Sequence, residues 1–172
     1  MDPAAWSREI DVNLSGVFHL IQATIGPMVD RGWGRIVNVS SVAARGGLKH
    51  QAGYSASKSG LLGLTRNVAL EHGADGVTCN AVLPGFVDTE NVLTMPAAMR
   101  DSLLQLTPTG RFGTPDEIAA LIRLLSGPDS GYINGAEIDI DGGFRLCPVS
   151  LTSRQGVLPP KRETEESTEY DG

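Results

Sequence analysis

The stretch GYSASKSG, residues 53–60, decides how this sequence is interpreted. It begins a run with helical apolar spacing, and it follows a β-branched run, residues 35–40, that predicts a strand. Tyr54 and Lys58 are four residues apart, so on a helix they lie on one face. An ammonium beside a phenol favours the phenolate and lowers the pKa of the tyrosine toward the working range. Such a tyrosine can move a proton to or from a carbonyl or hydroxyl oxygen.

The pair by itself leaves a second interpretation open, because an ordinary amphipathic helix also carries unrelated polar residues at this spacing. Ser41 adds a hydroxyl at the end of the predicted strand, where open α/β sheets bind their ligands. A hydrolase nucleophile at Ser40 or Ser41 is disfavoured, because no G-x-S-x-G turn surrounds them. The histidines have no metal-ligand spacing, so we expect no metal site.

Helical and strand patterns alternate along the chain. The spacing predicts helices over 4–30, 54–71 and 115–125, two short helical pieces within 90–107, a loop over 43–51, and strands over 35–40, 77–83 and 137–141. Such alternation is typical of an α/β fold with a parallel sheet and right-handed crossovers.

Composition bounds the class of protein. The chain has 172 residues, with 14 Lys and Arg against 20 Asp and Glu, and no basic stripe, which argues against nucleic-acid binding. No apolar run approaches the roughly 18 residues of a membrane span, and no signal-peptide pattern is present. Cys79 and Cys147 lack ligand-like spacing and fit free thiols in a reducing cytoplasm. Few apolar residues and many acids predict that 146–172 is a disordered tail behind one domain, 1–145.

Ser41, Tyr54 and Lys58 at this spacing resemble the catalytic signature of the short-chain dehydrogenase/reductase family. Further segments resemble that family in the same order: DVNL at 11–14, VNVSS at 37–41, NAVLPGFVDT at 80–89, GRFGTPDEIA at 110–119 and DIDGG at 139–143. The resemblance runs from about residue 5 to 145 and implies a Rossmann-like, doubly wound parallel sheet. It also implies an oxidoreductase that uses NAD or NADP.

The resemblance implies a role for each residue of the signature. Tyr54 would exchange a proton with the substrate oxygen, and Ser41 would hydrogen-bond that oxygen. Lys58 would hold the ribose of the cofactor and tune Tyr54. Asn13 would keep a water-linked proton path to Lys58 by distorting its own helix.

The resemblance also implies a nicotinamide-side loop after the predicted strand 77–83. Pro84 and Gly85 would end the strand where the backbone approaches a ligand, and glycine permits that approach. The backbone of Val87 and the hydroxyl of Thr89 would face the nicotinamide carboxamide. An ordinary turn with a helix cap at Thr89 is the alternative.

The family's glycine-rich turn, which receives the cofactor pyrophosphate at a helix N-terminus, has no counterpart in this sequence. We therefore expect a truncated fold in which the N-terminal dinucleotide-binding strands are absent. The predicted strand 35–40 would then have a free edge, which invites pairing with another chain. The choice between NAD and NADP stays open.

Two interpretations of function follow. The first is hydride transfer between a nicotinamide cofactor and a small alcohol or ketone, with 3-oxoacyl and 3-hydroxyacyl compounds as candidates. The second is a catalytically silent homologue that acts only by associating with other subunits. Members of the family commonly form tetramers, which implies a homo-oligomer associating through 5–29 and 54–72.

Overall fold

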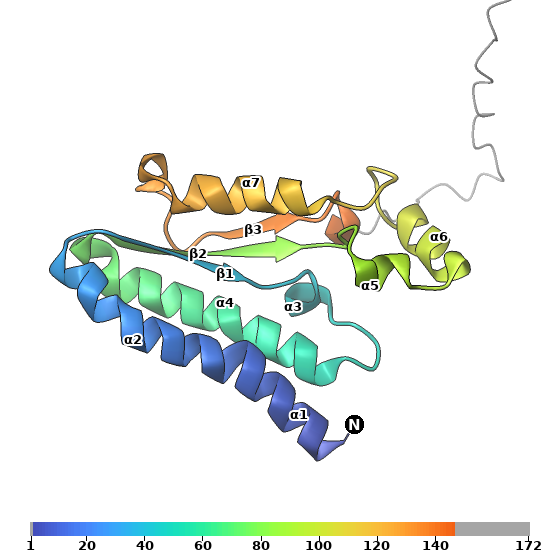
Figure 1. Ribbon diagram of the computed structural model, residues 1–172, viewed down its shortest axis with the longest axis horizontal. Helices are drawn as coiled ribbons and strands as arrows, with labels where there is room; N and C mark the ends of the chain where they lie inside the picture. Colours follow the sequence, from blue (N-terminus) through green and yellow to red (C-terminus); the bar gives the residue numbers. More distant parts are fainter. Residues whose placement is uncertain (1, 147–172) are drawn as a thin grey trace, which may run out of the picture.

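The computed structural model describes residues 2–146, with Asn91 and Leu93 described by their backbone only (Figure 1). The longer helical elements are α1 (Pro3–Ile10), the π-helical turn η1 (Asp11–Ser15), α2 (Gly16–Asp30), α3 (Ala43–Gly46), α4 (Ala52–His72), α5 (Glu90–Leu93), α6 (Ala97–Gln105) and α7 (Pro115–Ser126). Three-residue 3-10 turns lie at η2 (Gly73–Asp75), η3 (Pro128–Ser130) and η4 (Phe144–Leu146). The strands are β1 (Gly34–Val39), β2 (Val77–Pro84) and β3 (Glu137–Ile140).

The three strands form one parallel sheet in the order β1-β2-β3. Gly34 of β1 is level with Val77 of β2, and Ala81 of β2 is level with Glu137 of β3. Figure 1 shows α2 and α4 on one face of the sheet and α7 on the other. The predicted α/β class with a doubly wound parallel sheet is thereby confirmed.

The core lies on both sides of β2, where seven of eight residues are buried. Alternate side chains of a strand face opposite ways, so Cys79, Ala81 and Leu83 share one face. Cys79 packs with Ile21, Val68 and Ala69 from α2 and α4, while Ala81 and Leu83 pack against α4 through Leu62. Because helices cover both faces, β2 is buried along nearly its whole length, and its polar residues Thr78 and Asn80 are buried with the apolar ones.

Two predicted boundaries need correction. The predicted loop over 43–51 begins with the helical turn α3, because the N–H groups of Gly46 and Gly47 bond to the carbonyls of Val42 and Ala43. Arg45 anchors that turn to β3 by an ion pair of 2.9 Å with Glu137. Helix α4 begins at Ala52, two residues before the predicted start.

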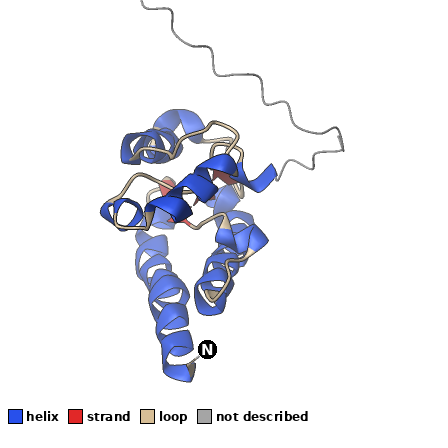
Figure 2. Ribbon diagram, turned by 90° about the vertical axis from the view of Figure 1, so that its right-hand side faces the viewer, coloured by secondary structure: helices blue, strands red, loops and turns tan. Residues whose placement is uncertain are grey.

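Helices α1 and α2 and the turn η1 join into one rod, Pro3–Asp30, that lies beside α4 (Figures 1 and 2). Ile21 alone is buried in this rod. The rod is long and apolar enough to cross a membrane by length and composition, so the expectation that no segment reaches this threshold was wrong. A helix that packs in a protein core meets the same threshold, and this rod packs against α4 and β1.

The chain after β3 continues into η4, which ends at Leu146. Residue 146, predicted as the start of the tail, therefore belongs to an ordered turn. The rest of the predicted tail lies outside the described residues.

Candidate active site

Helix α4 places Tyr54 and Lys58 one turn apart. The Nζ atom of Lys58 lies 5.7 Å from the centre of the Tyr54 ring. The same Nζ donates a hydrogen bond of 2.9 Å to the carbonyl oxygen of Val39 at the end of β1. Burial lowers the pKa of Lys58, and the charge of Glu9 opposes this by raising it.

Ser41 lies just beyond β1 and is buried. Its Oγ accepts a hydrogen bond of 3.1 Å from the N–H of Ala43, which fixes the hydroxyl against the first turn of α3. The next N–H, that of Val42, donates to the carbonyl of Pro84 at 3.1 Å and so continues the pairing of β1 with β2. These bonds hold Ser41 at the carboxyl end of the sheet, where ligands of such folds bind.

Ser41 and Tyr54 line a common pocket of about 210 Å³. The predicted cofactor residues Gly85, Val87 and Thr89 line it too. The other lining residues are Val42, Leu48, Phe86 and Val92. The sequence predicted substrate contacts within 43–52 and 90–107, which contain Leu48 and Val92, but it named none of these four as a site residue. An apolar residue carries no spacing signal that separates a pocket wall from ordinary packing.

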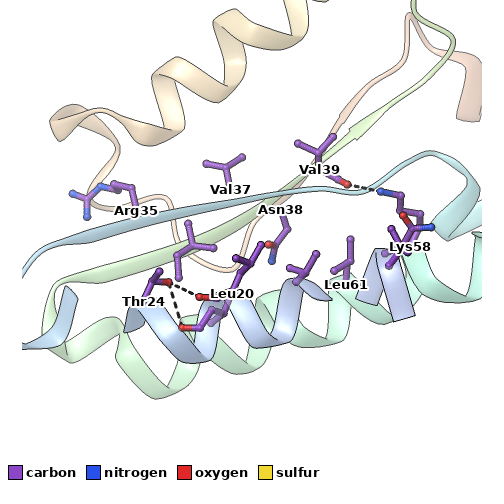
Figure 3. A pocket seen from close by; sticks show the side chains of 13 residues that line it. Leu20, Thr24, Arg35, Val37, Asn38, Val39, Lys58 and Leu61 are labelled. Atoms are coloured by element: carbon purple, nitrogen blue, oxygen red, sulfur yellow. Dashed lines mark hydrogen bonds between the residues drawn. The ribbon is translucent and has the colours of Figure 1, made fainter. Parts of the chain in front are cut away.

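Asn13 and Lys58 line a different hollow, a groove of about 410 Å³ between the rod and β1 (Figure 3). Lys58 occupies one end of the groove and Arg35 the other. The predicted catalytic residues are therefore divided between two neighbouring hollows, with α4 contributing Tyr54 to one and Lys58 to the other.

Asn13 lies in the middle of the π-helical turn η1. The N–H of Gly16 bonds to the carbonyl of Asp11, five residues earlier, which is the hydrogen bond of a π-helix. Asn13 donates from Nδ2 to Oε2 of Glu9 at 2.6 Å. The sequence interpretation missed Glu9, although the spacing of four residues between Glu9 and Asn13 could have identified it.

The loop after β2 packs closely against the end of β3 at Gly85. A Cβ atom on Gly85 would come within 2.8 Å of the Cα atom of Asp141, so the chain segment of Asp141 occupies the space beside this glycine. Packing between the ends of β2 and β3 therefore requires glycine at this position, and the predicted approach of a ligand stays a prediction. Pro84 lies at the end of β2, level with Ile140.

Val87 forms a parallel bridge with Gly113. The N–H of Gly113 donates to Phe86 at 2.9 Å, and the N–H of Asp88 donates to Gly113 at 2.8 Å. Since alternate residues point their backbone groups to opposite sides in such a pairing, the N–H and C=O of Val87 point away from Gly113. Both groups of a pocket-lining residue are then available to a ligand.

Thr89 occupies the N-cap position of α5, as the alternative interpretation expected, but its side chain makes no capping hydrogen bond. Behind the pocket, the ring of Phe86 lies 5.2 Å from Phe144 and 6.2 Å from Phe112, measured between ring centres. Within residues 2–146, no group of three His, Cys, Asp or Glu side chains could hold a metal ion.

The chain is similar in sequence to several known proteins. Residues 1–145 match the model of a protein family described as Enoyl-(Acyl carrier protein) reductase. An acetoacetyl-CoA reductase of Allochromatium vinosum is 43% identical over 144 residues, which make up 84% of this chain and 58% of that protein. A (3R)-3-hydroxyacyl-CoA dehydrogenase of Rattus norvegicus is 40% identical over 145 residues, or 84% of this chain and 56% of that protein.

The fold is matched as well. The crystal structure of a 3-oxoacyl-[acyl-carrier protein] reductase from Brucella melitensis is similar with a TM-score of 0.81 and 35% identity, covering 83% of this chain and 54% of that one. The chain thus spans a little over half the length of these relatives. The family match, the identities and the common fold show that the chain belongs to the short-chain dehydrogenase/reductase family.

Proposed function

We propose that this chain carries the proton-transfer site of an NAD- or NADP-dependent oxidoreductase that interconverts a small alcohol and its ketone. The observation that carries the proposal is the common pocket of Ser41 and Tyr54, which brings two hydroxyl groups to one cavity of about 210 Å³. Two hydroxyls of this kind can hydrogen-bond a single carbonyl oxygen, and Tyr54 can supply the proton that the oxygen needs.

The pocket suits the nicotinamide end of a dinucleotide. The backbone N–H and C=O of Val87 point away from their bridge partner Gly113, and the hydroxyl of Thr89 is not used as a helix cap. These groups match the donor and acceptor of a carboxamide. When bound, the nicotinamide would supply or receive the hydride.

Each residue then has a distinct task. Tyr54 donates its phenolic proton when the ketone is reduced and takes a proton in the reverse direction. Ser41 stabilises charge that develops on the substrate oxygen. Lys58, whose Nζ lies at the edge of β1, would turn from the carbonyl of Val39 to the ribose of the cofactor. Asn13 lines the same groove as Lys58.

We further propose a 3-oxoacyl or 3-hydroxyacyl thioester as the substrate. The similar proteins are named for acetoacetyl-CoA, 3-hydroxyacyl-CoA and 3-oxoacyl-carrier-protein substrates. Val42, Leu48 and Val92 give the pocket an apolar wall beside the hydroxyls of Ser41 and Tyr54. A short acyl chain with one keto group has this combination of surfaces.

The test is oxidation of NADH and of NADPH, in the presence of acetoacetyl-CoA, by a version of the chain extended with a complete cofactor-binding half. Ser41→Ala should lower turnover about 10²–10³-fold, which is the usual effect of removing one oxyanion donor. Tyr132→Phe, a change on a fully exposed side chain, serves as the matched control. Turnover by the wild-type chain that Ser41→Ala leaves unchanged would contradict the proposed site.

A silent homologue that acts through subunit association is the second candidate. The exposed apolar side chains of the rod, among them Val12, Phe18 and Leu20, favour it. The same assay separates the two candidates, because an extended version that self-associates without oxidising either cofactor fits only the second.

A further inference from the structure

Glu9 is a charged residue beside the proposed site that has been given no task in it. It lies in the last turn of α1 and is half-buried. A Cβ atom on Gly53 would come within 3.2 Å of the Cβ of Glu9, so the stem of Glu9 lies directly over the first turn of α4. Gly53 precedes Tyr54 in that turn. The glycine thus lets a carboxylate from the rod approach the helix that carries Tyr54 and Lys58.

The carboxylate is held by the turn that carries Asn13. Asn13 donates from Nδ2 to Oε2 of Glu9 at 2.6 Å, a short hydrogen bond to a charged acceptor. The π-helical bond from Gly16 to Asp11 widens the helix around Asn13. A hydrogen bond to Glu9 limits the rotation of the Asn13 amide, whose oxygen remains available to a water or to Lys58.

Lys58 faces Glu9 across the contact between α1 and α4. On its own helix Lys58 has the ring of Tyr54, and on β1 it has the neutral carbonyl of Val39. The other cation of the groove, Arg35, bonds to the carbonyls of Gly34 and Gly76 at the opposite end. Among the described groups, Glu9 is therefore the carboxylate whose field acts on Lys58, and it raises the pKa that burial lowers.

We propose that Glu9 is a positioning residue of this site, which fixes the amide of Asn13 and sets a negative charge opposite the ammonium of Lys58. This inference rests on the proposed function, because it takes Asn13 and Lys58 as parts of the site. The charge favours the ammonium form of Lys58, which burial disfavours, and an ammonium is the form that can hold ribose hydroxyls and stabilise a phenolate.

Three variants of the full chain separate the two tasks of Glu9. Glu9→Gln keeps an acceptor for Asn13 and removes the charge, while Glu9→Ala removes both. Asp11→Asn is the matched control, because Asp11 is an exposed carboxylate on the same rod, two residues away.

The readouts need neither cofactor nor turnover. The chain has three lysines, so isotope-labelled reductive methylation followed by NMR resolves Lys58 once Lys49→Arg and Lys161→Arg have assigned the others. We expect the Lys58 titration to move to lower pH in Glu9→Gln and Glu9→Ala and to stay in place in Asp11→Asn. The side-chain amide protons of Asn13 should exchange faster with solvent in Glu9→Ala than in Glu9→Gln.

A Lys58 titration that does not move in Glu9→Gln overturns the inference, as does an equal shift in Asp11→Asn. Equal exchange of the Asn13 amide in Glu9→Gln and Glu9→Ala also overturns it. Because these outcomes are read without substrate, they stay distinct from a failure of the proposed oxidoreductase activity, which the turnover assay reports.

Discussion

Two segments rich in apolar residues, the strand β2 and the rod, are buried to very different degrees. Strand β2 is buried in seven of its eight residues, between α4 on one face and α7 on the other. The rod also carries regularly spaced apolar residues, at the period of a helix, but it buries only Ile21, and Val12, Phe18 and Leu20 are exposed. The difference teaches that a pattern determines which face of an element is apolar, while burial depends on how many elements pack against that face.

We call the buried surroundings of β2 the closed region, and the rod together with the free edge of β1 the open region. Gly34 and Ser40 donate to the carbonyls of Gly76 and Val82 of the β2 side, so the backbone groups of Arg35, Val37 and Val39 point away from β2. Within the described residues, β1 pairs with β2 alone, and the carbonyl of Val39 is bonded by the side chain of Lys58. Unpaired edge groups and an exposed apolar rod meet along the same groove.

The largest expected effect contrasts two leucines. Leu83 in β2 is 0% exposed, and Leu20 in the rod is 68% exposed. Leu83→Ala should lower the free energy of unfolding by about 2–5 kcal/mol, because it leaves a cavity in the core. Leu20→Ala should change it by less than about 0.5 kcal/mol. Urea unfolding followed by circular dichroism measures both, and equal losses would contradict the division into closed and open regions.

The open region should also drive self-association of the chain. Leu20→Lys should raise the dissociation constant of the oligomer about 10-fold or more, because a central apolar contact typically contributes over 1 kcal/mol. Tyr132→Lys, which alters an exposed aromatic residue outside the rod, should leave it unchanged. Light scattering over a concentration series gives the comparison. A wild-type chain that stays a compact monomer throughout the micromolar range would rule this prediction out.

A smaller effect tests whether the rod packs on α4. A Cβ on Gly60 would come within 2.6 Å of a methyl carbon of Leu14, whereas a Cβ on Gly63 meets nothing within 4 Å. Gly63→Ala should stabilise the helix by about 0.5–1 kcal/mol. Gly60→Ala should lose that gain, since Leu14 must move away. The prediction fails if both variants are stabilised equally in thermal unfolding.

The smallest effect concerns a surface pair on the α7 side. Hydrogen bonding from Arg111, followed by the backbone N–H of Thr114, lowers the pKa of Glu117 to about 2. Since the folded pKa is below the unfolded one, the contribution of this carboxylate is complete above its ordinary pKa of 4.5 and is lost as the pH falls toward 2. Thermal unfolding of Glu117→Gln should show a flatter acid limb than the wild type, by a small margin because the pair is exposed.

The sequence predicted most of the fold because the decisive signals are local. Gly32 and Gly76 adopt positive φ between a predicted helix and the strand that follows it. The apolar runs predict both ends of each strand to within one residue. The short helix α3 was missed because its glycines suggested a loop, and the ion pairs of Arg45 that hold it join residues over 90 positions apart.

The residue types of the site were predictable from the sequence, but the division of their side chains between two hollows was not. Spacing places Tyr54 and Lys58 on one face of α4, yet the side chains enter two hollows because Lys58 reaches the edge of β1. The interaction of Gly85 with Asp141 depends on how β2 and β3 end side by side. Such tertiary contacts leave no trace in the local pattern.

The central claim is that Tyr54 supplies the proton in a pocket shared with Ser41. The most direct measurement is the turnover of the Tyr54→Phe variant with acetoacetyl-CoA, in a version of the chain extended with a complete cofactor-binding half, paired with a titration of the cofactor. The account predicts that turnover falls about 10²–10⁴-fold, the usual contribution of general acid catalysis, while cofactor affinity stays nearly constant because the ring still packs. Lys58→Ala should weaken both. If Tyr54→Phe retained more than about a third of the wild-type turnover with chemistry rate-limiting, the assignment of Tyr54 as proton donor would be contradicted.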